Sequence, residues 1–284
     1  MPVRLDEFEA ASPALAARAW RERLAGGDVL LGLWVVSSSP TVAEILGASG
    51  ADWIIIDAEH STNPLPAIVD QLRALAASSP FAVVRAASKD PLELARLLDA
   101  GAPGLMVPMV ESREQAEAVV QATRYPPRGR RGVGGGFARA TRWTGISDYI
   151  PRAEETFSLI VQIESLAGIQ ALDEILGVDG IDGIFIGPAD LAASLGHLGN
   201  PRHPDVQAAV EGAIRKAVEV GAVAGVNAFG VPDALRYRDA GAQLLAVGAD
   251  VTLLTSGSAG LLAQFAPAES DPGAASDTDR YRTE

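Results

Sequence analysis

Eight apolar segments alternate with eight segments of helical character between residue 30 and residue 265. The apolar segments are rich in β-branched residues, and several stop abruptly at a carboxylate, as DWIIID and LIVQIE do. Parallel strands that are buried on both faces have such continuous apolar sequences. Eight strand–helix units in succession therefore predict a closed parallel (β/α)8 barrel, the TIM-barrel fold, with right-handed crossovers.

The expected strands share an apolar run bounded by turn residues. They cover residues 30–36, 52–57, 81–85, 104–110, 159–163, 180–187, 222–228 and 242–248. Helices are expected between them, and Pro91, Ser112 and Gly101 mark helix starts and an end. A loop is expected between the sixth strand and the helix that begins at Asp205. An open doubly wound sheet would give the same alternation, but no glycine-rich dinucleotide fingerprint follows the first strand.

Length and composition suit a single barrel. The chain has 284 residues, 48% of them hydrophobic, and one α/β barrel commonly has about 250 residues. We predict an N-terminal extension over 1–28, with a helix from Pro13 to Leu24 that packs on the barrel bottom or on a partner. The barrel domain is expected over 29–266. Residues 267–284 are polar, rich in Pro, Gly and Ser, and without an apolar period, so we expect a disordered tail.

Charge and cysteine content exclude several functions. The net charge of −13 gives no general attraction for phosphate backbones, so nucleic acid is not an expected partner. The absence of cysteine excludes disulfides, thiolate–zinc sites and a cysteine nucleophile, and it suits a cytoplasmic protein. The N-terminus lacks the apolar region of a secretory signal. No apolar run reaches the ~18 residues of a membrane span, so no membrane association is expected.

Polar side chains gather at the expected carboxyl ends of four strands. They are Asp57, Glu59, His60, Ser61, Arg85, Gln162, Glu164 and Asp190. In a barrel these ends meet at one mouth, where such barrels keep their chemistry. Glu164 and Asp190 together would offer hard oxygen ligands to a divalent cation such as Mg²⁺ or Mn²⁺. Each acid alone could instead cap the following helix; for the pair, we favour the metal.

His60 is a candidate acid/base. Its imidazole can take and return a proton near neutral pH, and Asp57, three residues earlier, could fix its tautomer. The alternative is that Ser61 or Asn63 caps the helix that begins at Pro64 and that His60 is a bystander. The carboxylate pair at the same mouth favours catalysis.

Arg85 ends an apolar strand, and a buried guanidinium there requires an anion. It could recognise a carboxylate or a developing oxyanion, form a structural ion pair with Glu59 or Asp57, or do both.

The only lysines are Lys89 and Lys216. Neither fits the desolvated strand lysine of a Schiff-base enzyme, which favours metal over imine chemistry.

The segment 124–143 is basic and glycine-rich in an otherwise acidic chain. One interpretation is a mobile loop over the mouth that binds anionic groups through arginine and backbone N–H groups. The other is a subunit-contact loop. Its GVGGG run is weak as a phosphate motif because it does not join a strand to a helix.

With these residues in view, the chain resembles the HpcH/HpaI family of class II pyruvate aldolases over about residues 30–254. The motifs that carry the resemblance are IDAEH (56–60), VVR (83–85), VPMV (107–110), RYPPRGRRGVG (124–134), VQIE (161–164), GIFIGPADL (183–191), GNPRHPD (199–205) and AVGADVTLL (246–254). Their order and spacing together are far more specific than any one motif. The family includes 4-hydroxy-2-oxoheptanedioate and 2-keto-3-deoxy sugar-acid aldolases. It has the (β/α)8 fold and usually forms a hexamer of three dimers that exchange the last helix.

The resemblance implies a function and roles for individual residues. The reaction would be reversible cleavage of a 4-hydroxy-2-oxo acid to pyruvate and an aldehyde through a metal-stabilised pyruvate enolate. Glu164 and Asp190 would bind Mg²⁺, Mn²⁺ or Co²⁺, which would chelate pyruvate. His60, supported by Asp57, would be the acid/base. The residues implied in substrate binding are Arg85, which would stabilise the enolate, and Gln162, Gly187, Pro188 and Ala189.

Three alternatives remain open from the sequence. Citrate-lyase or malyl-thioester lyases and phosphoenolpyruvate-mutase-like barrels share the same metal–enolate chemistry, although the IDAEH, VQIE and GPAD motifs fit the aldolase branch better. A non-catalytic barrel that binds acidic metabolites is the third. Asn227, in a segment that is more aliphatic in relatives, would make the aldehyde pocket more polar.

Overall fold

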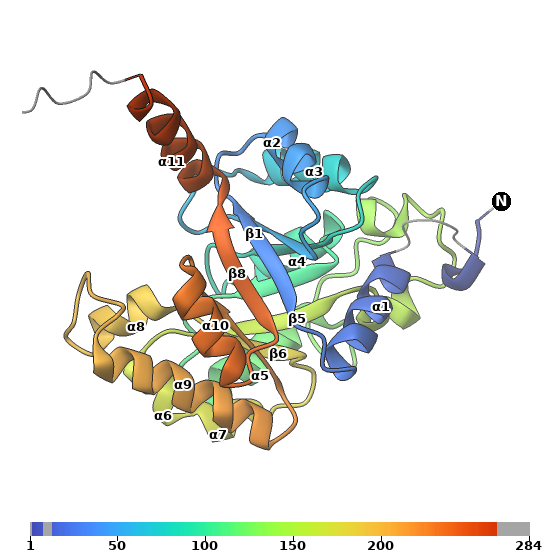
Figure 1. Ribbon diagram of the computed structural model, residues 1–284. Coiled ribbons are helices and arrows are strands. Elements are labelled where there is room, and N and C mark those ends of the chain that lie inside the picture. Colours follow the sequence, from blue (N-terminus) through green and yellow to red (C-terminus); the bar gives the residue numbers. More distant parts are fainter. Residues whose placement is uncertain (1, 8–12, 266–284) are drawn as a thin grey trace, which may run out of the picture.

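The computed structural model describes residues 2–7 and 13–265, and these form a closed barrel of eight parallel strands (Figure 1). The strands neighbour one another in chain order, and β8 closes the barrel by pairing with β1. They are β1 Leu30–Val35, β2 Trp53–Asp57, β3 Phe81–Arg85, β4 Gly104–Val107, β5 Ser158–Ile163, β6 Gly183–Ile186, β7 Val223–Asn227 and β8 Leu244–Ala249. The predicted (β/α)8 barrel is confirmed, and the open sheet is excluded.

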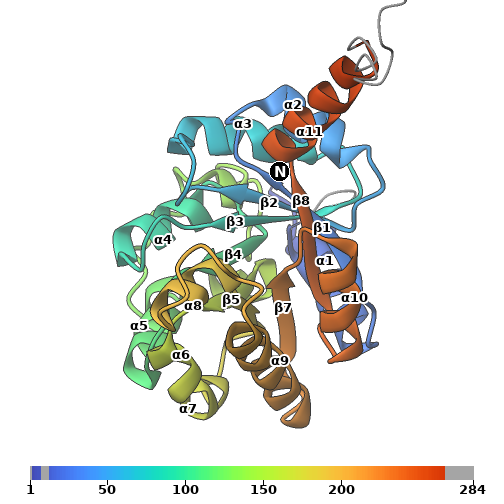
Figure 2. The same ribbon diagram turned by 60° about the vertical axis from the view of Figure 1, so that its left-hand side comes forward.

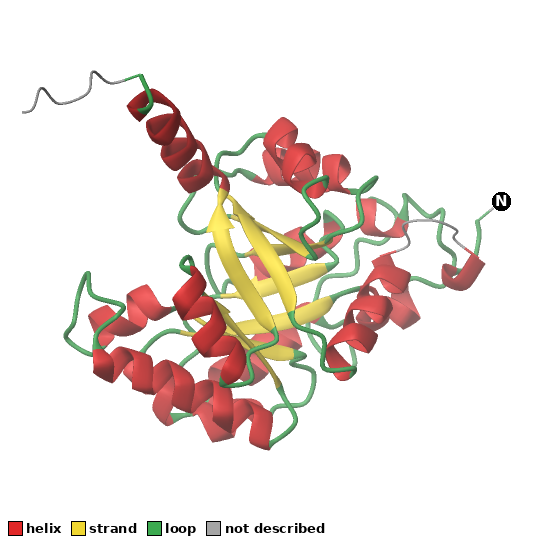
Figure 3. Cartoon of the chain, viewed as in Figure 1, coloured by secondary structure: helices red, strands yellow, loops and turns green. Residues whose placement is uncertain are grey.

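Helices surround the strands (Figures 2 and 3). The α-helices are α1 Pro13–Ala25, α2 Pro40–Gly47, α3 Leu65–Leu75, α4 Pro91–Asp99, α5 Arg113–Thr123, α6 Leu166–Gln170, α7 Leu172–Leu176, α8 Pro188–Ser194, α9 Pro204–Glu219, α10 Val231–Asp239 and α11 Asp250–Ala263. Short 3₁₀ helices cover Leu5–Glu7, Arg139–Thr141 and Ile150–Thr156. The side chains of Ser39, Asp90 and Ser112 accept backbone N–H groups at helix starts, as N-caps do.

Two departures from the sequence prediction have a clear local cause, and the sixth strand is also shorter than expected, Gly183–Ile186 instead of 180–187. The fourth strand ends at Val107, three residues early, because Pro108 has no N–H to donate and Met109 has a φ of 53°. The predicted loop after the sixth strand contains a helix, α8, which starts directly at Pro188. Proline at the first helical position and Asp190 in the first turn favour that start.

The barrel has an inner core and an outer core. Inside the strands, Trp34, Trp53 and Phe185 pack edge-on with centroid distances of 6.0–6.3 Å. Outside, the aliphatic residues of the strands pack against the helices. Helix α1 belongs to the inner cluster, because Trp20 stacks on Phe81 with ring centroids 4.5 Å apart. The predicted N-terminal helix therefore packs on the barrel bottom.

The last helix, α11, projects away from the barrel (Figure 1). Of its residues only Asp250 is buried, while Leu253, Leu254, Leu261 and Leu262 are exposed. The tail predicted to be disordered, 267–284, lies outside the described residues. Within 2–7 and 13–265 no helix has the length and apolar character needed to cross a membrane.

Candidate active site at the carboxyl ends of the strands

The barrel brings most of the predicted site residues to one end. Asp57 and Arg85 are the last residues of β2 and β3 and stand side by side in the strand register. Glu164 follows β5 directly, and Asp190 lies in the first turn of α8, four residues after β6. Because all strands are parallel, these positions share the carboxyl-terminal mouth.

Arg85 lies at the centre of a buried ionic cluster. It is 6% exposed. Its Nε donates to Asp57 Oδ1 at 2.8 Å and its Nη2 to Asp57 Oδ2 at 2.7 Å. Its Nη1 lies 2.9 Å from Glu59 Oε2, and its guanidinium covers the Trp34 ring at 4.5 Å. Both structural ion pairs considered from the sequence are therefore present. A guanidinium held on three sides is a fixed positive charge beside the mouth.

Glu164 is buried, 2% exposed, and held through both oxygens. The Met109 N–H donates to Oε1 at 2.8 Å, and Gln162 Nε2 donates to Oε2 at 3.2 Å. Gly187 makes room for the carboxylate, since a Cβ there would lie 2.5 Å from Oε2. Burial, helped by the charges of Glu59 and Asp190, raises the pKa of Glu164 to about 7 against the lowering effects of the Met109 N–H and Arg85.

Asp190 is exposed, and its charge acts on both neighbouring acids. Burial is the main cause that raises the pKa of Glu59; Arg85 and His60 oppose it, and Asp57 and Asp190 add to it. Three carboxylates thus act on one another at this mouth. Gln162 Oε1 is buried without a hydrogen-bond partner in the described part of the chain. An oxygen-only donor set that concentrates negative charge fits a hard divalent cation such as Mg²⁺ or Mn²⁺.

His60 stands at the rim of this mouth. Its side chain is 63% exposed, and its Nε2 lies 3.9 Å from Glu59 Oε2. Asp57, the partner expected from the sequence, is engaged by Arg85 and accepts the Glu59 N–H at 3.0 Å. Among residues 2–7 and 13–265, no hydrogen bond joins His60 to Asp57. The acid/base role of the pair stays a prediction.

Sequence reasoning missed the parts that Trp34 and Met109 play at the mouth, although it expected Glu59, the third carboxylate, there. Trp34 carries the face on which Arg85 stacks. Met109 acts through its backbone, and Lys89 Nζ donates to its carbonyl oxygen at 2.5 Å and to Gln115 Oε1 at 2.9 Å. Pro108, inside a predicted strand, was the available signal that the backbone turns here.

A cavity of about 500 Å³ adjoins the mouth. Its lining includes Pro188 and Ala189 from the start of α8, Arg202 from the following loop, and Asn227 at the end of β7. Asn227 Oδ1 accepts a hydrogen bond from Trp34 Nε1 at 2.8 Å. Through Trp34, Asn227 is therefore linked to the Arg85 cluster.

The basic, glycine-rich segment does not lie over this mouth, so that interpretation is corrected. The segment joins α5 to β5 and therefore lies at the opposite, amino-terminal end of the strands. Arg131 is buried there, pairs with Asp99 at 2.6 Å and stacks on Tyr125. Arg139 donates to the carbonyl oxygen of Ala100, just after α4. These arginines bind the protein's own groups.

Comparison with known proteins agrees with the geometry. Residues 30–257 match the family model described as HpcH/HpaI aldolase/citrate lyase. A 4-hydroxy-2-oxo-heptane-1,7-dioate aldolase of Klebsiella pneumoniae is 46% identical over 87% of this chain and 93% of its own length. A hydroxypyruvate/pyruvate aldolase of Pseudomonas aeruginosa is 43% identical over 92% and 98% of the two chains.

Among solved structures, an HpcH/HpaI aldolase/citrate lyase family protein from Burkholderia cenocepacia superposes with a TM-score of 0.84 and 39% identity. The superposition covers 87% of this chain and 98% of that one. The similarity therefore spans the complete barrel and all the strand ends described above. The chain belongs to the HpcH/HpaI aldolase/citrate lyase family.

Proposed function

We propose that the protein is a divalent-metal-dependent aldolase, a carbon–carbon lyase that reversibly cleaves 4-hydroxy-2-oxo acids to pyruvate and an aldehyde. The observation that carries the proposal is the meeting of Glu164, Asp190 and Arg85 at the carboxyl ends of the strands. The similarity to proteins named as aldolases, at 43–46% identity over most of the chain, supports the same reaction class.

In this proposal Glu164 and Asp190 hold a divalent cation, Mg²⁺, Mn²⁺ or Co²⁺. When bound, the cation supplies Lewis-acid stabilisation of negative charge on the keto oxygen of the substrate. The Met109 N–H and Gln162 Nε2 donate hydrogen bonds that orient the Glu164 carboxylate. Metal-binding side chains are commonly oriented by hydrogen bonds of this kind.

Substrate positioning falls to the groups around this pair. Arg85, fixed by Asp57 and Glu59, faces the developing oxyanion with a charge that needs no reorganisation. Gln162 and the backbone of Gly187, Pro188 and Ala189 line the pyruvate position. The adjoining 500 Å³ cavity is large enough for an aldehyde portion, and Asn227 makes its wall polar.

Proton transfer is assigned to His60. Its exposed imidazole at the rim can exchange a proton between the substrate methyl group and water, directly or through one water molecule. Asp57 supports this step indirectly, because it fixes Arg85 and the Glu59 backbone.

We further propose that residues 29–266 form the aldolase domain of a cytoplasmic homo-oligomer, a hexamer built as a trimer of dimers. The support is α11, which leaves the barrel with its leucines exposed (Figure 1). An exposed apolar helix of this kind is typical of a subunit contact.

Deuterium exchange tests the proposed function. The protein is incubated with pyruvate in D₂O, and methyl deuteration is followed by NMR with and without a chelator. We expect exchange that the chelator abolishes and that excess Mg²⁺ or Mn²⁺ restores. Glu164→Gln should lose exchange, while Glu117→Gln, which alters an exposed helix pair with Arg113, should retain it. Exchange that ignores the chelator, or that survives in Glu164→Gln, would refute the proposal.

A further inference from the structure

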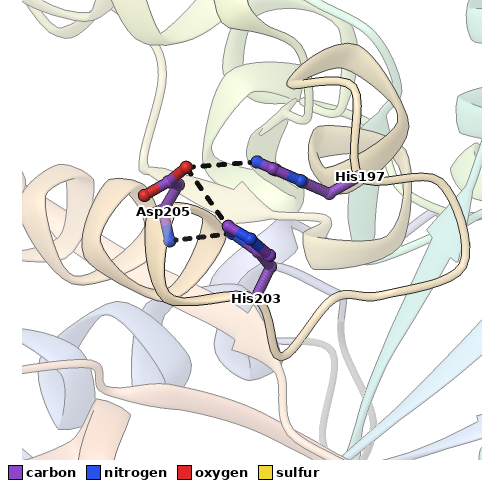
Figure 4. A group of neighbouring side chains, drawn as sticks. All are labelled: His197, His203 and Asp205. Atoms are coloured by element: carbon purple, nitrogen blue, oxygen red, sulfur yellow. Dashed lines mark hydrogen bonds and ion pairs between the residues drawn. The ribbon is translucent and has the colours of Figure 1, made fainter.

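The loop between α8 and α9 gathers a second set of ligand atoms, apart from the strand-end carboxylates. His197, His203 and Asp205 each place one nitrogen or oxygen atom within 4.8 Å of the others (Figure 4). His197 Nε2 lies 3.2 Å from Asp205 Oδ2, and His203 Nδ1 lies 3.6 Å from the same oxygen. His197 and His203, with the rim residue His60, are the only histidines of the chain.

The two nitrogen–oxygen separations are close to those of tetrahedral coordination. Zinc binds histidine nitrogen and carboxylate oxygen at about 2.0–2.2 Å, which places neighbouring ligand atoms of a tetrahedron roughly 3.3–3.6 Å apart. The two nitrogen–oxygen distances of 3.2 and 3.6 Å lie at this spacing. Three protein ligands leave the fourth position to water, as in open zinc sites.

The three side chains already lie together, but the loop must rearrange locally to bind a cation. The two imidazole rings stack with centroids 3.5 Å apart and an interplanar angle of 13°. His203 Nδ1 also accepts the Asp205 N–H at 3.3 Å, as the N-cap of α9. Imidazole lone pairs lie in the ring plane, so a cation bound by these atoms must draw the rings out of the stack and displace that N–H. Metal binding therefore breaks the N-cap hydrogen bond of α9 and the stack of the two rings, and forms coordination bonds in their place.

We propose that His197, His203 and Asp205 form a second metal site, selective for borderline transition metals such as Zn²⁺, Co²⁺ or Ni²⁺. Two imidazoles and one carboxylate suit these ions, whereas Mg²⁺ prefers oxygen ligands alone. The site ties the loop 196–203 to the first turn of α9. Gly199 to Arg202 of that loop line the 500 Å³ cavity, so the bound ion would stiffen one wall of it.

Calorimetric titration with Zn²⁺ in excess Mg²⁺ tests the site through two variants that preserve local structure. His203→Asn removes the imidazole but keeps a favourable N-cap side chain for α9. His197→Phe keeps an aromatic ring to stack on His203 but has no ligand nitrogen. Each should bind one Zn²⁺ fewer per chain than the wild type, with an unchanged unfolding temperature in the absence of metal.

Glu164→Gln serves as the matched control, because it leaves the loop intact and should still bind Zn²⁺ at His197, His203 and Asp205. Combining it with His197→Phe should remove that binding. The proposal would be overturned if His203→Asn and His197→Phe both bound as many Zn²⁺ ions per chain as the wild type, whatever happens at Glu164.

Discussion

Replacing Arg85 by methionine should be among the most damaging single changes to the stability of this barrel. The change removes two charged hydrogen bonds to Asp57 and the ion pair with Glu59. The side chains of Arg85 and Asp57 are 8% and 2% exposed, so the remaining carboxylates would have little access to water. Removing one partner of a buried ion pair costs about 3–5 kcal/mol, because the other charge is left uncompensated.

Urea unfolding followed by tryptophan fluorescence measures this cost, with the protein concentration held constant. The matched control is Arg113→Met, which breaks an exposed i,i+4 pair with Glu117 and should cost less than about 0.5 kcal/mol. The double variant Arg85→Met/Asp57→Asn should be more stable than Arg85→Met by at least ~1 kcal/mol, because it also removes the buried charge that Arg85 no longer neutralises. Equal losses in Arg85→Met and Arg113→Met would refute the view that Arg85 neutralises a buried acidic cluster.

Two further substitutions test the support of the Glu164 carboxylate. Gly187→Ala places a Cβ 2.5 Å from Glu164 Oε2, so calorimetry should show Mn²⁺ affinity at the mouth falling about 10–100-fold. The control is Gly212→Ala, where a Cβ meets nothing within 4 Å, and this variant should keep the wild-type affinity. Equal affinities in the two variants would contradict a role for Gly187 in making room for the carboxylate. Lys89→Met removes the bond that holds the Met109 carbonyl and should cost about 1 kcal/mol in urea unfolding; wild-type stability would show that this bond does not support the turn.

Much of the fold could be predicted because local signals agree with one another. Continuous β-branched runs such as 53–57 and 159–163 announce strands buried on both faces. Ser112 and Asp90 announce the helix starts that they cap. Helix α8 escaped prediction because seven residues are too few for a 3.6-residue apolar period to stand out from a loop.

For the site, the sequence predicted which residues lie at the mouth but not which of them contact one another. The sequence puts Asp57 and Arg85 at strand ends, but only the register of β2 against β3 places them side by side. The Met109 N–H that holds Glu164 left no trace in residue identity, because every residue except proline has such a group. The arginines near Arg131 show their charge in the sequence but not the partners, such as Asp99, that neutralise it.

Crystals of the protein with Mn²⁺ and pyruvate would test the central proposal most directly, through the anomalous scattering of the metal. The account predicts a peak within coordination distance of the Glu164 and Asp190 carboxylates, with pyruvate against it and its oxygen facing Arg85. A map with ordered pyruvate but no metal peak at those two carboxylates would contradict it.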